Sequence, residues 1–157
     1  MKKKQLSLEY IEVSRLEKFD PVEQRLVSKA KAAALKAYSP YSGFQVGAAV
    51  LLENGEIFSG SNQENTAFPS GLCAERIALF AAATDFPDVP VRTLAVTAWT
   101  NEKYVSTPIT PCGSCRQVIV ETQKRFKNPV RLILYAEEKS LVFDNGGDLL
   151  PLPFDKF

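Results

Sequence analysis

The sequence contains no histidine, so thiolates, carboxylates or water would have to hold any transition metal. It also lacks an excess of charge of either sign, because 19 Lys and Arg face 18 Asp and Glu. Without a global positive field, a long nucleic acid is a poor candidate partner. No run approaches the roughly 20 apolar residues of a membrane span, and no signal-peptide pattern follows Lys2, Lys3 and Lys4. We therefore expect a cytoplasmic protein that binds neither nucleic acid nor membrane.

Cysteine is scarce, and its count is odd. Three cysteines do not make a disulfide framework, which leaves metal or redox chemistry as the reason for them. The chain has 157 residues, of which 45% are hydrophobic, and this suits one soluble globular domain. We expect an N-terminal extension over residues 1–19 and a single domain over residues 20–157.

The pattern along the chain predicts helices and strands in alternation. Asp20, Pro21 and Glu23 are typical of a helix start, and apolar residues recur at helical spacing as far as Tyr38. Asn54 and Gly55 predict a tight turn. That turn joins two strands, 44–52 and 56–65, and further helices are expected at 73–84 and 113–124, with strands at 93–98, 131–136 and 141–143. This order predicts a layered α/β domain whose later strands are parallel, because helical crossovers join them.

All three cysteines fall where a predicted helix begins: Cys73 at one helix, Cys112 and Cys115 at another. A helix start favours thiolate over thiol, and thiolate is the form that binds metal. Taken alone, Cys73 is typical of a small core residue. The other pair alone fits a dithiol redox couple as readily as half of a zinc site. A redox couple would leave Cys73 unexplained, whereas a metal site uses all three.

Three thiolates fill three of the four tetrahedral positions of zinc and leave the fourth for water, which is typical of a catalytic site. Glu75 lies two residues after Cys73, in the first turn of the predicted helix. A glutamate there is by itself an ordinary surface acid. Beside a zinc-bound water, its position predicts a proton shuttle.

The run Cys73, Ala74, Glu75, followed by Pro111, Cys112, Gly113, Ser114, Cys115, resembles the metal signature of the cytidine deaminase family, in its small three-cysteine homotetrameric type. The stretches 38–76 and 111–117 carry the resemblance. It implies a three-layer α-β-α domain with a mixed sheet of about five strands, and one Zn²⁺ per chain. It also implies hydrolysis of cytidine and deoxycytidine to uridine and deoxyuridine plus ammonia, as in pyrimidine salvage. Zinc hydroxide would attack carbon 4, while Glu75 would protonate ring nitrogen 3 and then the leaving amine.

The same resemblance assigns residues around the substrate. It implies that Asn62 and Glu64, which share one face of an extended segment, hold the ribose 3′-hydroxyl. Phe44 would lie against the pyrimidine, and Ala74 would also contact the substrate. From the residues alone, Asn62 and Glu64 could instead form a solvent-facing edge, and Phe44 could be a core aromatic.

Three further assignments concern charge and the edge of the site. Arg76 resembles the family arginine that hydrogen-bonds the zinc thiolates and offsets their charge, although an exposed helix arginine is the alternative. Phe68 stands where many relatives have tyrosine. Phe154 resembles the C-terminal aromatic that closes a neighbouring subunit's pocket, which implies a homo-oligomer, expected to be a tetramer, with shared active sites.

Other functions remain open at this point. A deaminase of a modified aminopyrimidine nucleoside, of the blasticidin S type, resembles this chain at the metal, but Asn62 and Glu64 argue against it. A thioredoxin-like dithiol oxidoreductase and a non-catalytic zinc module are alternatives of other classes. An editing enzyme for polynucleotides would need a basic groove, and Lys124, Arg125 and Lys127 are too few to predict one.

Overall fold

The computed structural model describes residues 1–156. Within them the chain forms three α-helices and a seven-stranded sheet. In chain order the elements are β1 (Ile11–Val13), α1 (Pro21–Ala34), β2 (Gln45–Leu52), β3 (Ile57–Ser61), α2 (Ala74–Asp85), β4 (Val91–Thr100), β5 (Lys103–Tyr104), α3 (Gly113–Phe126), β6 (Arg131–Leu134) and β7 (Ser140–Phe143). Short 3₁₀ turns lie at Leu16–Lys18, Phe68–Ser70 and Gly146–Leu149.

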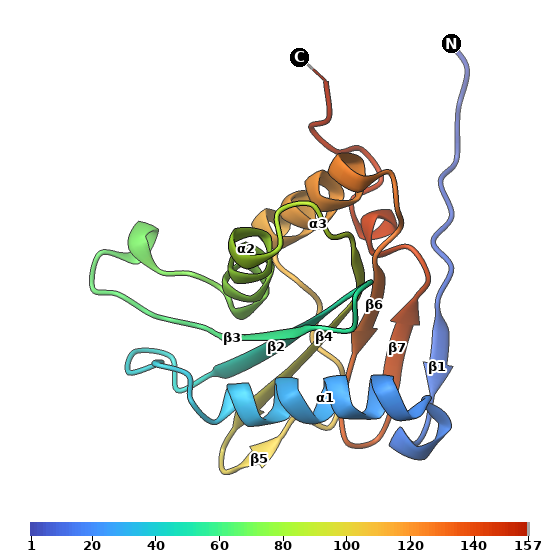
Figure 1. The fold of residues 1–157 in the computed structure, drawn as a ribbon. Helices are drawn as coiled ribbons and strands as arrows, with labels where there is room; N and C mark the ends of the chain where they lie inside the picture. Colours follow the sequence, from blue (N-terminus) through green and yellow to red (C-terminus); the bar gives the residue numbers. More distant parts are fainter. Residues whose placement is uncertain (157) are drawn as a thin grey trace.

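The sheet is the middle of three layers (Figure 1). Its strand order is β1-β7-β6-β4-β2-β3, and β5 pairs with β4. The alternation along β2 explains the layers: Ala48 and Val50 pack with α2 and α3 on one face, whereas Ala49 and Leu51 pack with α1 on the other. The three-layer α-β-α prediction with a mixed sheet is thus confirmed.

The sheet differs from the prediction in strand number and in one direction. It has seven strands instead of about five, because β1 and β5 were not predicted. The α3 crossover does make β4 and β6 parallel. The prediction of parallel later strands is wrong for β7, which runs antiparallel to β6 because only a short loop joins them. β1 lies within residues 1–19 and pairs with β7 through Ile11 and Val142.

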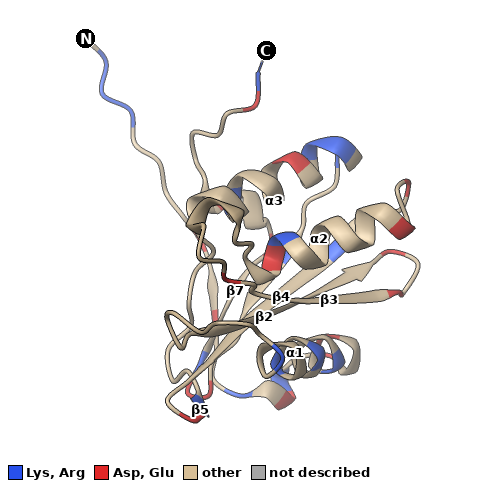
Figure 2. Ribbon diagram, turned by 90° about the vertical axis from the view of Figure 1, so that its left-hand side faces the viewer, with Lys and Arg blue, Asp and Glu red and all other residues tan. Residues whose placement is uncertain are grey.

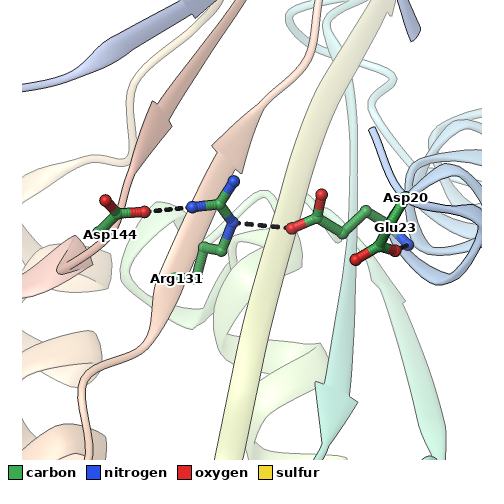
Figure 3. A network of polar contacts seen from close by, with 4 residues as sticks. All are labelled: Asp20, Glu23, Arg131 and Asp144. Carbon is green, nitrogen blue, oxygen red and sulfur yellow. Dashed lines mark hydrogen bonds and ion pairs between the residues drawn. The ribbon is translucent and has the colours of Figure 1, made fainter. Parts of the chain in front are cut away.

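Helix α1 begins as its capping signal predicts. The Asp20 carboxylate accepts a hydrogen bond from the backbone N–H of Glu23 at 2.7 Å, a cap that contributes about 1 kcal/mol. Glu23 itself is buried, and its carboxylate accepts a hydrogen bond from Arg131 Nε at 2.7 Å. Arg131 also pairs with Asp144 just after β7 (Figure 3). This network ties the first turn of α1 to β6 and to the end of β7.

The helix ends at Ala34, before the predicted Tyr38. Tyr38 instead donates its N–H to the carbonyl of Asn62 at 3.0 Å and accepts from the N–H of Glu64 at 2.8 Å. This pairing satisfies both backbone groups of Tyr38 outside the helix. It also brings the segment after α1 beside two of the expected sugar-binding residues.

Gly60 lets α2 approach the sheet closely. A Cβ at this position of β3 would lie 2.5 Å from the carbonyl oxygen of Ala74 and 2.6 Å from the nitrogen of Ala78. Only a residue without a side chain fits there, so Gly60 fixes the height of the first turn of α2 above the sheet. Among residues 1–156, no helix is both long and apolar enough to cross a membrane.

Candidate metal centre and adjoining pocket

The three cysteines come together from two helix starts. Cys73 is the N-cap residue of α2, Cys112 is the N-cap residue of α3, and Cys115 is buried in the first turn of α3. N-cap side chains usually accept a backbone hydrogen bond, but neither cysteine does so here. All three are free thiols, and their sulfur atoms lie within 4.8 Å of one another. Both cap positions therefore leave a sulfur atom available to a shared ligand.

The sulfur spacing fits a tetrahedral metal. The Sγ atoms of Cys73 and Cys112 are 3.7 Å apart, and those of Cys112 and Cys115 are 3.6 Å apart. Zn–S bonds of about 2.3 Å at the tetrahedral angle require a sulfur–sulfur distance of about 3.8 Å. The donor set and its spacing thus fit Zn²⁺ with one coordination position left over.

Arg76 lies next to these sulfur atoms. Its Nη2 donates to Cys73 Sγ at 3.6 Å. Hydrogen bonds from Cys115 and from Arg76 hold the pKa of the Cys73 thiol well below its ordinary value. The pKa of the Cys115 thiol is raised, because it hydrogen-bonds the Cys73 sulfur and is buried. The Arg76 guanidinium therefore lies where it can offset the negative charge of a thiolate at Cys73.

Glu75 is a buried acid on the second position of α2, with only 4% of its surface exposed. Burial raises the pKa of its carboxyl group, and the neighbouring Cys73 sulfur raises it further. A carboxyl group whose pKa is raised by burial holds its proton more readily than an exposed one, and it can still give that proton up to a nearby base. This is the property that a general acid and base requires.

A cavity of about 670 Å³ opens beside the sulfur atoms. The predicted site residues that line it are Phe44, Asn62, Glu64, Phe68, Cys73, Glu75, Arg76 and Cys112. The structure therefore brings together residues from the loop before β2, the segment after β3, and the starts of both helices. The volume of this cavity lies within the usual range for a small-molecule site, about 300–1,000 Å³.

Asn62 and Glu64 both bond to the loop that precedes β2, and Asn62 also bonds to the start of that strand. Asn62 accepts from the N–H of Val46 at 2.7 Å and donates to the carbonyl of Phe44 at 2.9 Å. Glu64 accepts from the N–H groups of Tyr41 at 2.8 Å and Ser42 at 3.2 Å. The Ser42 hydroxyl and these backbone donors keep the pKa of the Glu64 carboxyl below its ordinary value, so it is an acceptor at neutral pH.

Three predicted residues lie away from the cavity wall or at its edge. The Ala74 side chain is buried in the core below α2, so any contact with a substrate would have to come from its backbone. Phe68 is 76% exposed and makes an edge contact with Tyr41 at the cavity mouth. Phe154 does not line this cavity; Gln117 holds its backbone through two hydrogen bonds, and its side chain is exposed.

Sequence reasoning missed several residues of this site. Tyr41, Ser42 and Thr110 line the cavity. Arg116 holds the loop before Cys112, donating to the carbonyl of Pro111 at 2.7 Å and to Thr110 Oγ1 at 3.1 Å. The positions of Thr110 and Arg116 next to the cysteine pair were a usable signal. Nothing local marked Ser42, whose partner Glu64 is 22 residues away.

Comparisons with known proteins agree with this geometry. Residues 21–128 match the family model described as the cytidine and deoxycytidylate deaminase zinc-binding region. A cytidine deaminase of Sporosarcina psychrophila is 46% identical over 98 residues, which cover 62% of this chain and 68% of the relative. One of Halalkalibacterium halodurans is 44% identical over 98 residues, covering 62% and 70%.

Solved structures give the same result. The crystal structure of cytidine deaminase from Burkholderia pseudomallei has a TM-score of 0.71 and 40% identity, covering 83% of this chain and 97% of that one. The cytidine deaminase of Mycobacterium tuberculosis has a TM-score of 0.65 and 31% identity, covering 85% and 98%. On the family match, which spans both helix starts that carry the cysteines, this chain belongs to the cytidine and deoxycytidylate deaminase family.

Proposed function

We propose that this protein is a zinc-dependent hydrolase that converts cytidine and deoxycytidine to uridine and deoxyuridine and releases ammonia. The observation that carries the proposal is the placement of the buried Glu75 carboxyl beside three sulfur atoms at tetrahedral spacing, on a cavity of nucleoside size. The relatives that carry the name cytidine deaminase support the same activity.

Cys73, Cys112 and Cys115 would hold one Zn²⁺ per chain. Zinc at such a site acts as a Lewis acid that makes a water molecule acidic enough to react near neutral pH. Three thiolates give the centre a net charge of about −1, which works against that acidity. We assign the compensation to Arg76 and to the positive ends of α2 and α3, since the arginine donates to Cys73 and both helices start at the sulfur atoms.

Glu75 would move the protons. It takes a proton from the attacking water and delivers it to ring nitrogen 3, while the water oxygen bonds to carbon 4. It then takes the proton of the new hydroxyl group and gives it to the amino group. The carbon–nitrogen bond breaks, ammonia leaves, and the ring retains a carbonyl at carbon 4 and a proton on nitrogen 3. One buried carboxyl with a raised pKa can serve both transfers.

The cavity wall orients the nucleoside. Phe44 would lie against the pyrimidine, the backbone of Ala74 would contact it, and Asn62 and Glu64 would hold the 3′-hydroxyl of the sugar. Each of these two polar side chains retains hydrogen-bonding capacity beyond its bonds to residues 41–46.

We further propose a homotetramer in which Phe154 closes a neighbouring subunit's cavity and Phe68 stands at its mouth. Three free thiols that must stay reduced to bind metal suit the cytoplasm. A role in pyrimidine salvage follows from the reaction.

A polynucleotide substrate is not favoured. Figure 2 shows Lys and Arg interspersed with Asp and Glu over all three helices. Among the described residues that line the cavity, Arg76 is the only Lys or Arg, and it is engaged with a sulfur atom. A single-stranded nucleic acid would need a continuous basic groove.

The decisive experiment compares the wild type with Glu75→Ala, using the exposed Glu121→Ala on α3 as the control. Zinc is quantified by mass spectrometry, and ammonia and uridine are measured after adding cytidine. We expect Glu75→Ala to keep about one zinc per chain but to lose more than about 10⁴-fold in kcat, because each of two proton transfers depends on this carboxyl and is worth about 10²–10⁴-fold. Normal turnover in this variant, or a wild type without zinc, would contradict the proposal.

A further inference from the structure

The hydroxyl of Ser42 connects two residues that the proposed function places at opposite ends of the substrate. Its Oγ donates a hydrogen bond to Glu64 Oε1. The same oxygen accepts a hydrogen bond from the backbone N–H of Phe44 at 3.0 Å. Glu64 belongs to the sugar end of the cavity, and Phe44 belongs to the base end.

The direction of these bonds is fixed by chemistry. A hydroxyl has a single proton, and a carboxylate can only accept, so the Ser42 proton must point at Glu64. The N–H of Phe44 can only donate, and it therefore meets a lone pair of the same oxygen. Ser42 has no alternative arrangement that satisfies both neighbours.

Ser42 also limits what Glu64 can still bind. The carboxylate offers about four acceptor positions. The backbone N–H groups of Tyr41 and Ser42 use two of them on Oε2, and the Ser42 hydroxyl uses one on Oε1. About one position is left, which is enough for one hydroxyl group of a sugar.

Phe44 is held from its other side as well. Its carbonyl accepts from Asn62 Nδ2 at 2.9 Å, and Asn62 Oδ1 accepts from the N–H of Val46 at 2.7 Å. Both backbone groups of Phe44 are thus bonded to side chains that connect to the proposed sugar end of the cavity. The carbonyl bonds to Asn62 directly, and the N–H is connected to Glu64 through Ser42.

We propose that Ser42 is a positioning residue that couples recognition of the sugar 3′-hydroxyl to placement of the pyrimidine ring. It aims the remaining acceptor of Glu64 and fixes the backbone from which Phe44 projects. The inference rests on the proposed function, because it takes Glu64 and Phe44 as the sugar-binding and base-binding residues.

Removing the Ser42 hydroxyl should therefore reduce the affinity that the protein gains from the 3′-hydroxyl of the sugar. Without Ser42 Oγ, Glu64 Oε1 regains an acceptor position that water can fill, and the carboxylate is free to turn away from the sugar. The lost bond is one to a charged group, the Glu64 carboxylate. A bond of this kind corresponds to a factor of about ten or more in an equilibrium constant, so we expect the affinity for the nucleoside to change by about that factor. Within residues 1–156, Ser42 makes no hydrogen bond to Glu75 or to the three cysteines, so the chemical step itself should change little.

The test measures kcat and KM for cytidine and for 3′-deoxycytidine in the wild type, Ser42→Ala, Ser42→Thr and Ser42→Val. Thr and Val have nearly the same shape, so this pair isolates the hydroxyl even if the alanine variant folds poorly. Ser39→Ala is the matched control, because Ser39 lies in the same loop and its hydroxyl makes no hydrogen bond within residues 1–156. Melting temperature and zinc content are measured for every variant.

We expect Ser42→Ala and Ser42→Val to raise KM for cytidine about tenfold while kcat stays within about threefold. The ratio of kcat/KM between cytidine and 3′-deoxycytidine should fall as well, because cytidine loses both the aimed acceptor of Glu64 and the placement of its ring by Phe44, whereas 3′-deoxycytidine loses only the placement of its ring. Ser42→Thr should restore both quantities, and Ser39→Ala should match the wild type.

An equal loss for both substrates would overturn the coupling and leave Ser42 a purely structural residue. A threonine variant that melts normally but does not restore the ratio would overturn it too. If the wild type does not deaminate cytidine at all, the proposed function fails. If the wild type is active and Ser42→Ala and Ser42→Val behave as Ser39→Ala does, only the present inference fails.

Discussion

Gly60→Ala tests whether the metal centre depends on how closely α2 approaches the sheet. The new Cβ would lie 2.5 Å from the carbonyl oxygen of Ala74, whereas ordinary contact begins at 3.4 Å. The Cβ and the oxygen must therefore separate by about 0.9 Å; the oxygen belongs to the backbone and the Cβ is attached rigidly to it, so neither atom can swing aside as the end of a flexible side chain does. Ala74 lies between Cys73 and Glu75, so the displacement falls on one proposed metal ligand and on the proposed proton shuttle.

The expected losses follow from this displacement. Overpacking of this kind costs about 1–3 kcal/mol. For a chain of this size that corresponds to a fall of about 2–12 °C in melting temperature. A shift near 1 Å exceeds the tolerance of about 0.2 Å in a metal–ligand distance, so the affinity for zinc should fall as well. A misplacement of about 1 Å costs about 10²-fold in kcat.

The assay combines calorimetry, zinc quantification and cytidine turnover. Gly113→Ala serves as the control, because a Cβ at the first residue of α3 meets nothing within 4 Å. Its melting temperature should stay within about 2 °C of the wild type, as for surface substitutions in general. A Gly60→Ala variant with wild-type melting temperature, zinc content and kcat would refute this reasoning. It would show that the close approach of α2 to β3 does not determine the positions of Cys73 and Glu75.

Two further outcomes concern the metal and the C-terminal tail. Removing zinc with a chelator should lower the melting temperature by about 8–16 °C, because a ligand at a thousand times its Kd stabilises the fold by about 4 kcal/mol. The check is a thermal scan of metal-loaded and metal-free protein, and equal melting temperatures would contradict a zinc site. Truncation before Phe154 should raise KM for cytidine while about one zinc per chain is retained, since this residue lies outside the cavity that holds the sulfur atoms. Equal loss of zinc and of nucleoside binding would contradict a closing role for the tail.

Features with a local signal were predicted correctly. The Asp20 carboxylate does cap α1 through the N–H of Glu23. Asn54 and Gly55 do form the hairpin turn, with Gly55 at a φ of +89° that favours glycine and the Asn54 side chain accepting from the N–H of Glu56. Each of these structures is stabilised by atoms a few residues apart, so a single sequence contains the information needed.

Features that depend on distant partners were not predicted. β1 is three residues long, and its pairing partner β7 lies about 130 residues further along the chain. β5 has two residues and follows a turn in which Asn101 and Glu102 both adopt positive φ, a conformation that is common for asparagine but unusual for glutamate. The end of α1 was misplaced because Tyr38 pairs with the segment around Asn62 and Glu64. In each case tertiary contacts override local propensity.

The two halves of the candidate site differ in the same way. The metal centre depends on residue identity and on position at a helix start, both of which the sequence displays directly. The cavity wall depends on hydrogen bonds that Glu64 and Asn62 make with residues 16 to 22 positions earlier in the chain, Ser42 among them. No local sequence pattern predicts these contacts. Substitutions in that wall can therefore change which nucleoside is accepted without altering the sulfur atoms or Glu75. Relatives with the same cysteine signature should differ in substrate mainly where the 41–46 and 62–68 loops differ, and the coupling through Ser42 predicts that such differences arise in both loops together.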